Sequence, residues 1–344
     1  MYNTATPKLV SAMLQEYGTI TRTALKDYLP AGEPRRYLYD LLSDYPERGG
    51  KMMRPSLCIA TARAFGARIE EALRTAVAIE LLHNALLIHD DIQDGSEERR
   101  GRPTLHVLHG IPLAINAGDT LTLISLRPLM ENRRTIGPHL SIRIIEETER
   151  MARESAEGQA MEIGWRQENI TDLGDADYFT MVLKKTCWLA TIYPSRVGAM
   201  IGTHDSIDLE PFIRFGFFLG TAFQIQDDIL NLIADQRYGK ERDGDLWEGK
   251  RTLMLIRLFR EATSDERIQL CTFLGLSREK QTSTHVRWIR QLIDTYGCIE
   301  YARQIAHGLA GAALHEHERI YADIPDSRDK QFIEGLTTWI FERT

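Results

Sequence analysis

An almost entirely apolar segment that ends in three aspartates is the feature that most restricts the fold of this chain. From Ala72 to Ile88 apolar residues occupy nearly all sides of a helix, which is typical of a buried helix. Asp90, Asp91 and Asp94 follow, and Asp90 and Asp94 lie one turn apart on the same face. Three carboxylates at the carboxyl end of a helix repel one another and the negative end of the helix dipole. A hard divalent cation bound through oxygen would offset that repulsion.

A second oxygen-rich cluster follows another apolar run, from Phe212 to Phe223. Asp227 and Asp228 repeat the paired aspartates, and Asn231 stands where the first cluster has its third carboxylate. A solvated acidic turn would explain either cluster alone, but the repetition favours a cleft with two facing walls. Each wall would hold Mg²⁺, and the metal would hold a polyanion such as diphosphate between the walls.

Composition limits the classes of function. The chain has 344 residues, is 43% hydrophobic and carries a net charge of −7. That length supports one large core or two modest ones, and the negative charge argues against a nucleic-acid partner. Four widely spaced cysteines without a metal-binding pattern indicate reduced thiols and a cytoplasmic protein. The first 20 residues lack a secretory signal pattern, and no apolar run is long enough to predict a transmembrane segment.

The hydrophobic periodicity is helical throughout, and no strand alternation persists. It predicts an all-α fold, with residues 1–344 forming a single-domain helical bundle around a deep apolar cleft. The main helices are expected at residues 34–42, 51–64, 70–94, 112–130 with an interruption at Gly118-Asp119, 138–166, 172–200 as two helices or one bent at Pro194, and 208–234. The charged segment 236–250 is expected to be a mobile loop.

The last third of the chain is predicted to be helical as well. Thr263 and Glu266 form a capping-box pattern at the start of one helix. Further helices are expected at 278–295, 299–320 and 327–341, with His315 and His317 on the surface of the second.

Basic residues occur at several places where they could bind the proposed anion. They include a pair after a glycine turn at a helix start, an arginine pair after the first acidic cluster, a lysine–threonine pair, and two lysines in the charged segment. These residues are Lys51 and Arg54, Arg99 and Arg100, Lys185 and Thr186, and Lys240 and Lys250. Taken alone, each is equally consistent with a solvated surface charge. His83, on the apolar helix, is on its own more typical of a buried core histidine.

Together these motifs resemble the trans-isoprenyl (polyprenyl) diphosphate synthases, and most closely a geranylgeranyl diphosphate synthase. The resemblance covers roughly Gly49 to Thr252. The matching motifs occur in the family's order and are Gly49-Gly50-Lys51-x-x-Arg54, Asp90-Asp91-x-x-Asp94, Arg99-Arg100-Gly101, Gly158-Gln159 with Glu162, Lys185-Thr186, Phe223-Gln224-x-x-Asp227-Asp228, and the lysines Lys240 and Lys250.

The resemblance implies an all-helical, homodimeric enzyme and a role for each matching residue. Asp90, Asp94 and Asp227 would bind Mg²⁺, as three ions with bound diphosphate, supported by Asp91 and Asp228. The residues implied for the allylic diphosphate are Arg99, Lys185, Thr186, Gln224, Asn231, Lys240 and Lys250. Those implied for isopentenyl diphosphate are Lys51, Arg54, His83 and Arg100.

The implied reaction is head-to-tail condensation of isopentenyl diphosphate with dimethylallyl, geranyl or farnesyl diphosphate, which releases diphosphate. In the family, aromatic residues at the positions of Ala85 and Leu86 stop the product at farnesyl. Ala85 is small, so geranylgeranyl diphosphate is expected, with farnesyl or a longer product as alternatives. Trp188, next to the lysine–threonine pair, has no assigned role.

Two other functions are compatible with part of the pattern. A class I terpene cyclase shares the aspartate motif but has no need of a second diphosphate pocket, so Lys51, Arg54 and Arg100 would be unexplained. A non-catalytic subunit of a heteromeric synthase would be expected to lose acidic ligands, and this chain keeps all five aspartates.

Overall fold

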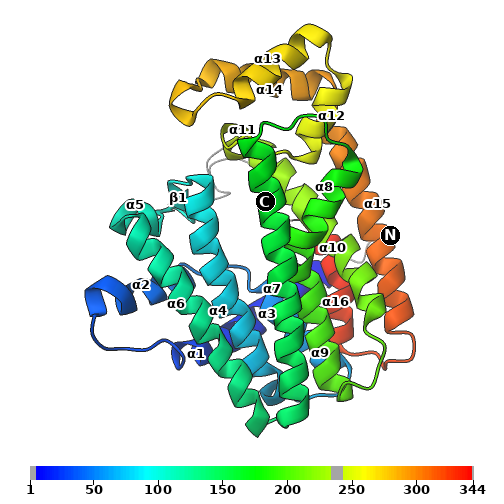
Figure 1. Cartoon of the computed structure of the whole chain (residues 1–344). Helices are drawn as coiled ribbons and strands as arrows, with labels where there is room; N and C mark the ends of the chain where they lie inside the picture. The colour runs from blue at the N-terminus through cyan, green and yellow to red at the C-terminus, as the bar shows by residue number, and fades with distance from the viewer. Residues whose placement is uncertain (1–4, 234–242, 343–344) are drawn as a thin grey trace.

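The computed structural model describes residues 5–233 and 243–342, and helices dominate it (Figure 1). The elements in chain order are α1 (Ala5–Lys26), the π-helix η1 (Arg35–Tyr39), α2 (Asp40–Glu47), α3 (Met53–Ala64), α4 (Ile69–Asp94), the strands β1 (Glu98–Arg99) and β2 (Arg102–Pro103), α5 (Leu105–His109), α6 (Ile111–Glu131), the 3-10 turn η2 (Asn132–Arg134), α7 (Pro138–Gln167), α8 (Asp175–Val182), the π-helix η3 (Leu183–Ile192), α9 (Tyr193–Thr203), α10 (Glu210–Ile233), α11 (Gly244–Trp247), α12 (Leu253–Glu261), α13 (Ser264–Leu274), the 3-10 turn η5 (Arg278–Lys280), α14 (Ser283–Thr295), α15 (Cys298–Ile320) and α16 (Arg328–Trp339). The all-α prediction is confirmed. The two short strands pair antiparallel as one small hairpin.

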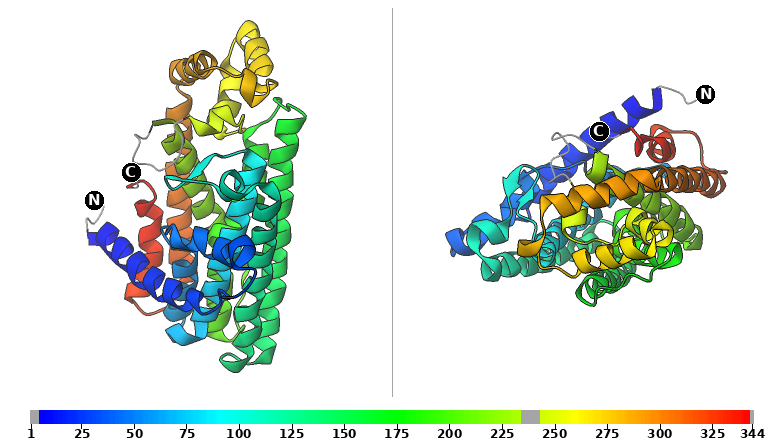
Figure 2. Two further views of the ribbon diagram at one scale, coloured as in Figure 1. Left: turned by 90° about the vertical axis from the view of Figure 1, so that its left-hand side faces the viewer. Right: turned by 90° about the horizontal axis from the view of Figure 1, so that it is seen from above.

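The long helices form a bundle, and α4, η3 and α10 carry many of its buried side chains. α4 packs against α3 and α6, η3 packs against α7 and α10, and α10 packs against α15. The pair α13 and α14 lies across one end of this bundle (Figure 2). One large apolar cluster fills the centre, and a smaller one fills the contact of α4 and α6 with α1 and α2.

The predicted central helix is confirmed as α4. Its buried side chains face neighbours on several sides, as its uniformly apolar sequence implies. It ends at Gly95, which adopts a left-handed conformation with φ 66°. The aspartates therefore stand on the last turns of a buried helix.

The expected interruption of the next helix at Gly118 is wrong, because α6 is continuous through this residue. A Cβ on Gly118 would come within 2.3 Å of His89 Nε2. The glycine therefore permits the close approach of α6 to α4 and does not break the helix.

The segment 172–200 contains a feature that the pattern did not predict. α8, η3 and α9 follow one another without an intervening loop, and Pro194 lies in the first turn of α9, directly after the π-helical turns of η3. The boundary near Pro194 agrees with the two-helix alternative, but the π-helix η3 is an addition to it.

The charged segment expected to be a mobile loop is only partly described. Its residues 236–242, including Lys240, lie outside the described residues. Residues 244–247 form α11, and Asp245 and Lys250 take part in side-chain ion pairs. For residues 244–247 the prediction of a loop is wrong, because they form a short helix, whereas the expected mobility stays a prediction.

Two expectations for the last third have opposite outcomes. The capping box is confirmed, since Thr263 Oγ1 accepts from Glu266 N at 3.3 Å and the Glu266 carboxylate accepts from Thr263 N at 2.8 Å. His317 is not on the surface as expected, because its ring is buried and stacks on Tyr321.

Across the described ranges 5–233 and 243–342, no helix is long and apolar enough to cross a membrane.

Candidate active site

Asp91 is held in place by its neighbours at the end of α4. The side chain is 1% exposed, and Arg99 Nε donates to both of its carboxylate oxygens, at 2.7 and 2.8 Å. The Tyr45 hydroxyl also donates to Asp91. Asp90 is more loosely held, with Arg99 Nη2 at 3.5 Å. Asp91 is therefore fixed by buried contacts, whereas the Asp90 side chain is the more exposed of the two.

Lys185 faces this acidic cluster from the π-helix η3. Its Nζ lies 2.9 Å from Glu162 and 3.5 Å from Asp90. Burial opposes the charge of Lys185, but Glu162 and Asp90 outweigh it and raise the lysine pKa. Irregular helical turns of the π type are frequent at functional sites, and here the turn carries Lys185 and Thr186.

The second wall is a hydrogen-bonded chain centred on Asp228, which is 2% exposed. Its carboxylate accepts from Tyr178 at 2.8 Å, from Gln224 at 2.7 Å and from Lys250 at 3.2 Å. Gln224 in turn accepts from Thr186 Oγ1 at 3.0 Å. The structure thus joins Thr186, Gln224, Asp228 and Lys250, which the resemblance implied for one site, and adds Tyr178 of α8, which was not predicted.

Asn231 has a structural contact that the sequence did not reveal. It is 5% exposed, and its Oδ1 accepts from the backbone N–H of Asp245 at 3.1 Å. This bond ties α11 to α10. Asp245 itself is buried, and its carboxylate lies 3.9 Å from Lys250 Nζ. The sequence analysis missed Asp245, whose only signal was an aspartate within a charged segment.

A second basic cluster gathers Arg54, His83 and Arg100, close enough to the first site for Asp227 and Asp91 to act on its charges. Burial lowers the pKa of Arg54 to about 10, and its buried Nε has no hydrogen-bond partner among the described residues. The Arg100 guanidinium lies so close to Gly50 that a Cβ there would meet it at 2.8 Å. Burial, followed by the charges of Arg54 and Arg100, holds the pKa of His83 well below its usual value.

A buried acid, Glu80, lies beside this basic cluster and was not among the predicted site residues. Glu80 is 5% exposed, one turn before Asn84 on α4, and accepts from Asn84 Nδ2 at 3.1 Å. Burial raises the pKa of Glu80, while the nearby charges of Arg54 and Arg100 oppose that rise. Lys51 lies over the Trp339 ring, 5.6 Å from its centroid. Trp339 is the last residue of α16, so this contact joins the last helix to Lys51.

The carboxylates fit a divalent cation that is shared with a substrate. Within residues 5–233 and 243–342, no three His, Cys, Asp or Glu side chains converge into a complete metal cage. Burial, followed by the charge of Asp90, raises the pKa of Asp94 to about 6. Mg²⁺ is usually held by one or two carboxylates together with substrate phosphate oxygens, and an incomplete, mutually repelling set is suited to that arrangement.

The positions expected to control chain length face different parts of the interior. Ala85 is fully buried in the smaller apolar cluster, where α4 meets α6. Leu86 is partly buried against the large central cluster. Trp188 packs between two guanidinium groups, with Arg150 4.6 Å and Arg196 6.0 Å from its ring centroid. This gives the tryptophan a packing role between η3, α7 and α9.

Comparisons with known proteins agree with this geometry. The family model described as polyprenyl synthetase matches residues 35–293. A geranylgeranyl pyrophosphate synthase from Geoglobus acetivorans is 32% identical over 335 residues, which cover 97% of this chain and 99% of that protein.

Solved structures show the same fold. A geranylgeranyl pyrophosphate synthetase from Pyrococcus horikoshii superposes with a TM-score of 0.85 at 32% identity, covering 97% of this chain and 98% of the other. A polyprenyl synthase from Caulobacter crescentus, complexed with calcium and isoprenyl diphosphate, also has a TM-score of 0.85, at 25% identity over 98% of both chains.

Proposed function

Because the chain belongs to the polyprenyl synthetase family, we propose that it condenses isopentenyl diphosphate head to tail with an allylic diphosphate. The proposed main product is geranylgeranyl diphosphate. The observation that carries the proposal is a pair of acidic walls with Lys185 between them, next to a second basic cluster. Two distinct anion sites are what a reaction between two diphosphates requires.

The first site would hold the allylic diphosphate. Its proposed residues are Arg99, Lys185, Thr186, Gln224 and Lys250, together with Asn231 and Lys240, the last of which lies outside the described residues. Asp90, Asp94 and Asp227 would hold Mg²⁺, in three ions with bound diphosphate. Bound Mg²⁺ would neutralise the charge that develops on the leaving diphosphate. Arg99 and Lys185 would act on the same charge from fixed positions.

The second site would hold isopentenyl diphosphate. Lys51, Arg54, His83 and Arg100 would bind its diphosphate and direct its double bond toward the allylic carbon. Breaking the allylic C–O bond leaves a carbocation, and the double bond attacks it to form the new C–C bond. Loss of a proton to the departing diphosphate then restores an allylic product. The apolar lining of the cleft would keep water from the cation.

Product length would depend on the space beside α4. Ala85 offers no bulk against the α6 side, which supports a twenty-carbon product; farnesyl or longer products are the alternatives. A class I terpene cyclase would leave the basic cluster unexplained. A non-catalytic subunit would not need the buried network that orients Asp228 and Lys250.

We also propose that the chain is a homodimer and that residues 1–344 form one domain. Support for the dimer comes from large apolar side chains exposed along α5 and α6, which are Val107, Leu108, Ile111, Ile115, Leu123, Leu126 and Met130. Analytical ultracentrifugation should show a dimer that Leu123→Lys weakens, and a monomeric wild type would contradict it. If residues 1–344 form one domain, we expect the chain to unfold in a single cooperative transition.

The test of function is direct. The purified chain is incubated with Mg²⁺, isopentenyl diphosphate and, separately, dimethylallyl, geranyl and farnesyl diphosphate, and the products are resolved by length. A twenty-carbon diphosphate supports the full proposal, whereas a fifteen-carbon product supports the reaction and corrects the length. No elongation with any primer would overturn it in favour of the cyclase or the silent subunit.

A further inference from the structure

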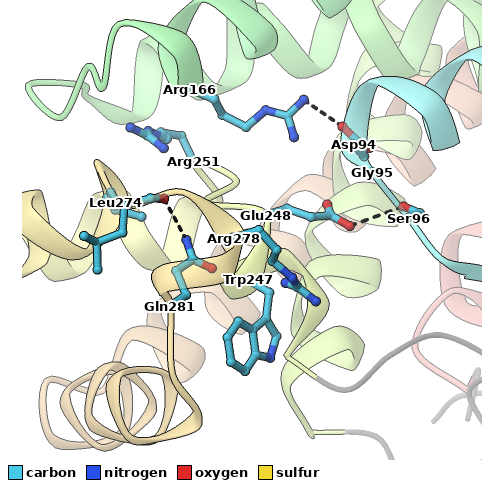
Figure 3. Close-up of a pocket in the computed structure, with 11 residues that line it drawn as sticks. Asp94, Gly95, Ser96, Arg166, Trp247, Glu248, Arg251, Leu274, Arg278 and Gln281 are labelled. Atoms are coloured by element: carbon cyan, nitrogen blue, oxygen red, sulfur yellow. Dashed lines mark hydrogen bonds and ion pairs between the residues drawn. The ribbon is translucent and has the colours of Figure 1, made fainter.

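A cavity of about 280 Å³ lies beside Asp94, at the ends of α4 and α7 and under the connection between α13 and α14 (Figure 3). Among the described residues of the two proposed diphosphate sites, Asp94 alone lines it. The volume is room for about nine water molecules at ~30 Å³ each, which is enough for a small polyatomic anion. The cavity is therefore a separate space that opens next to the proposed metal-binding acid.

Three arginines line the cavity, and one of them is almost completely buried. Arg251 is 4% exposed, and its hydrogen-bond partners among the described residues are all neutral: Nε donates to the Ile170 carbonyl at 3.0 Å and Nη2 to Asn169 Oδ1 at 2.8 Å. Nη1 donates to the Gly249 carbonyl. A guanidinium has five N–H donors, so these three bonds leave donors for a further acceptor.

Arg166 adds a second positive charge close to Arg251 in the cavity wall. Burial and the neighbouring charge of Arg166 lower the pKa of Arg251 to about 10. Arg166 is itself paired with Asp94, with Nη2 at 2.7 Å from Oδ1. Once Asp94 is engaged by a cation, Arg166 loses that ion pair and is left with the charges of Glu162 and Glu248, next to the Arg251 guanidinium. An anion between the two guanidinium groups would offset both the burial and the repulsion.

The opposite wall adds a third cation and a polar amide. Figure 3 shows Arg278 beside Trp247, and its guanidinium carbon lies 4.6 Å from the ring centroid. Gln281 also lines the cavity, and its Oε1 is buried without a hydrogen-bond partner among the described residues. Glu248 is the one further acid of the lining and accepts from Ser96 at 3.5 Å.

We propose that this cavity is a third anion site, which binds inorganic diphosphate after its release from the allylic substrate. The assignment of diphosphate as the occupant rests on the proposed function, whereas the binding of a phosphate-type anion rests on the arginines alone. Arg166, Arg251 and Arg278 hold the anion, and Asp94 connects the cavity to the reaction site. The site gives the leaving group a place to move to, outside the pocket that the next allylic diphosphate occupies.

The proposal is tested by binding without turnover. Inorganic diphosphate, inorganic phosphate and isopentenyl diphosphate are titrated separately into the full chain in EDTA by isothermal calorimetry. Diphosphate is expected to bind, with Arg251→Gln and Arg278→Gln each raising its Kd by about tenfold, the loss of one charge-assisted contact. Arg260→Gln is the matched control, since Arg260 is exposed and pairs with Asp175 away from the cavity.

Lys185→Gln separates this cavity from the reaction site. Diphosphate binding should persist in Lys185→Gln. If isopentenyl diphosphate binds at the arginines more tightly than inorganic diphosphate does, the proposed occupant is wrong. Loss of binding in Lys185→Gln with no effect of Arg278→Gln would overturn the site itself. Arg278 is exposed, so its variant tests the site even where Arg251→Gln fails to fold. A wild type that binds diphosphate but elongates no primer would overturn the proposed function and leave the anion site standing.

Discussion

Gly158 of α7 lies directly against the backbone of Lys185 in η3: a Cβ on the glycine would come within 2.2 Å of the lysine amide nitrogen. The two helices can therefore cross at this distance only because residue 158 has no side chain. The crossing sets the position of Lys185 between Glu162, on the same helix as Gly158, and Asp90 on α4.

Gly158→Ala is expected to separate α7 from η3 and move Lys185 away from the acidic cluster. We expect a loss of about 1–3 kcal/mol in stability from overpacking, together with a fall in kcat of about a hundredfold from misplacement. Gly164→Ala on the same helix is the control, because a Cβ there meets nothing within 4 Å. That substitution should raise stability slightly, and equal activities of the two variants would contradict the role assigned to Gly158.

Phenylalanine at the two expected chain-length positions distinguishes two routes for the growing tail. Ala85 faces the smaller cluster against α6 and Leu86 the central cluster, so each substitution blocks a different side of α4. We expect Ala85→Phe to shift the product from twenty to fifteen carbons, as measured by chromatography of the dephosphorylated products. Leu86→Phe is the comparison. An unchanged product in Ala85→Phe with a shorter one in Leu86→Phe would place the tail on the side of the central cluster.

Buried His317 predicts a loss of stability in acid. Burial, followed by the charge of Lys330, lowers its pKa from 6.5 to about 4. Between these values the unfolded chain takes up a proton that the folded chain does not, so stability falls as the pH falls from 6.5 to about 4. The full effect is about 3 kcal/mol.

Denaturant unfolding of wild type and His317→Phe at pH 7 and pH 4 measures this effect. The variant keeps an aromatic ring against Tyr321 and should lose less stability on acidification than the wild type. His315→Phe, on the exposed face of the same helix, controls for the effect of replacing a histidine by phenylalanine. Parallel losses in wild type and His317→Phe would show that another group is responsible.

Asn231 is expected to matter more for structure than for charge. Asn231→Asp keeps an oxygen for the Asp245 N–H and adds a carboxylate one turn from Asp227. We expect nearly unchanged kcat and a lower Mg²⁺ concentration for half-maximal activity. Asn231→Ala leaves a buried N–H without its acceptor, which costs about 1–3 kcal/mol and loosens the attachment of α11. Thermal unfolding and a Mg²⁺ titration of activity measure these effects. Equal stabilities and equal Mg²⁺ requirements of Asn231→Asp and Asn231→Ala would contradict the structural role of Asn231.

The sequence by itself determined the acidic and basic motifs and the helices that carry them. A helix places residues three and four positions apart on one face, so the spacing of Asp90 and Asp94 after an apolar run determined that they share a face at the end of that helix. The end of α4 at Gly95 and the capping box at Thr263 are likewise local features. Local rules suffice for these because each depends on residues within about one turn.

The tertiary structure alone decided which charges meet and which are buried. The pairs Arg99–Asp91 and Lys185–Glu162, and the burial of His317, depend on segments that packing brings together and that no local pattern specifies. Local reasoning also misread Gly118, whose missing side chain serves a neighbouring helix. Side-chain burial and helix crossings are properties of the packed interior, so the sequence supplied the reacting groups and packing supplied their partners.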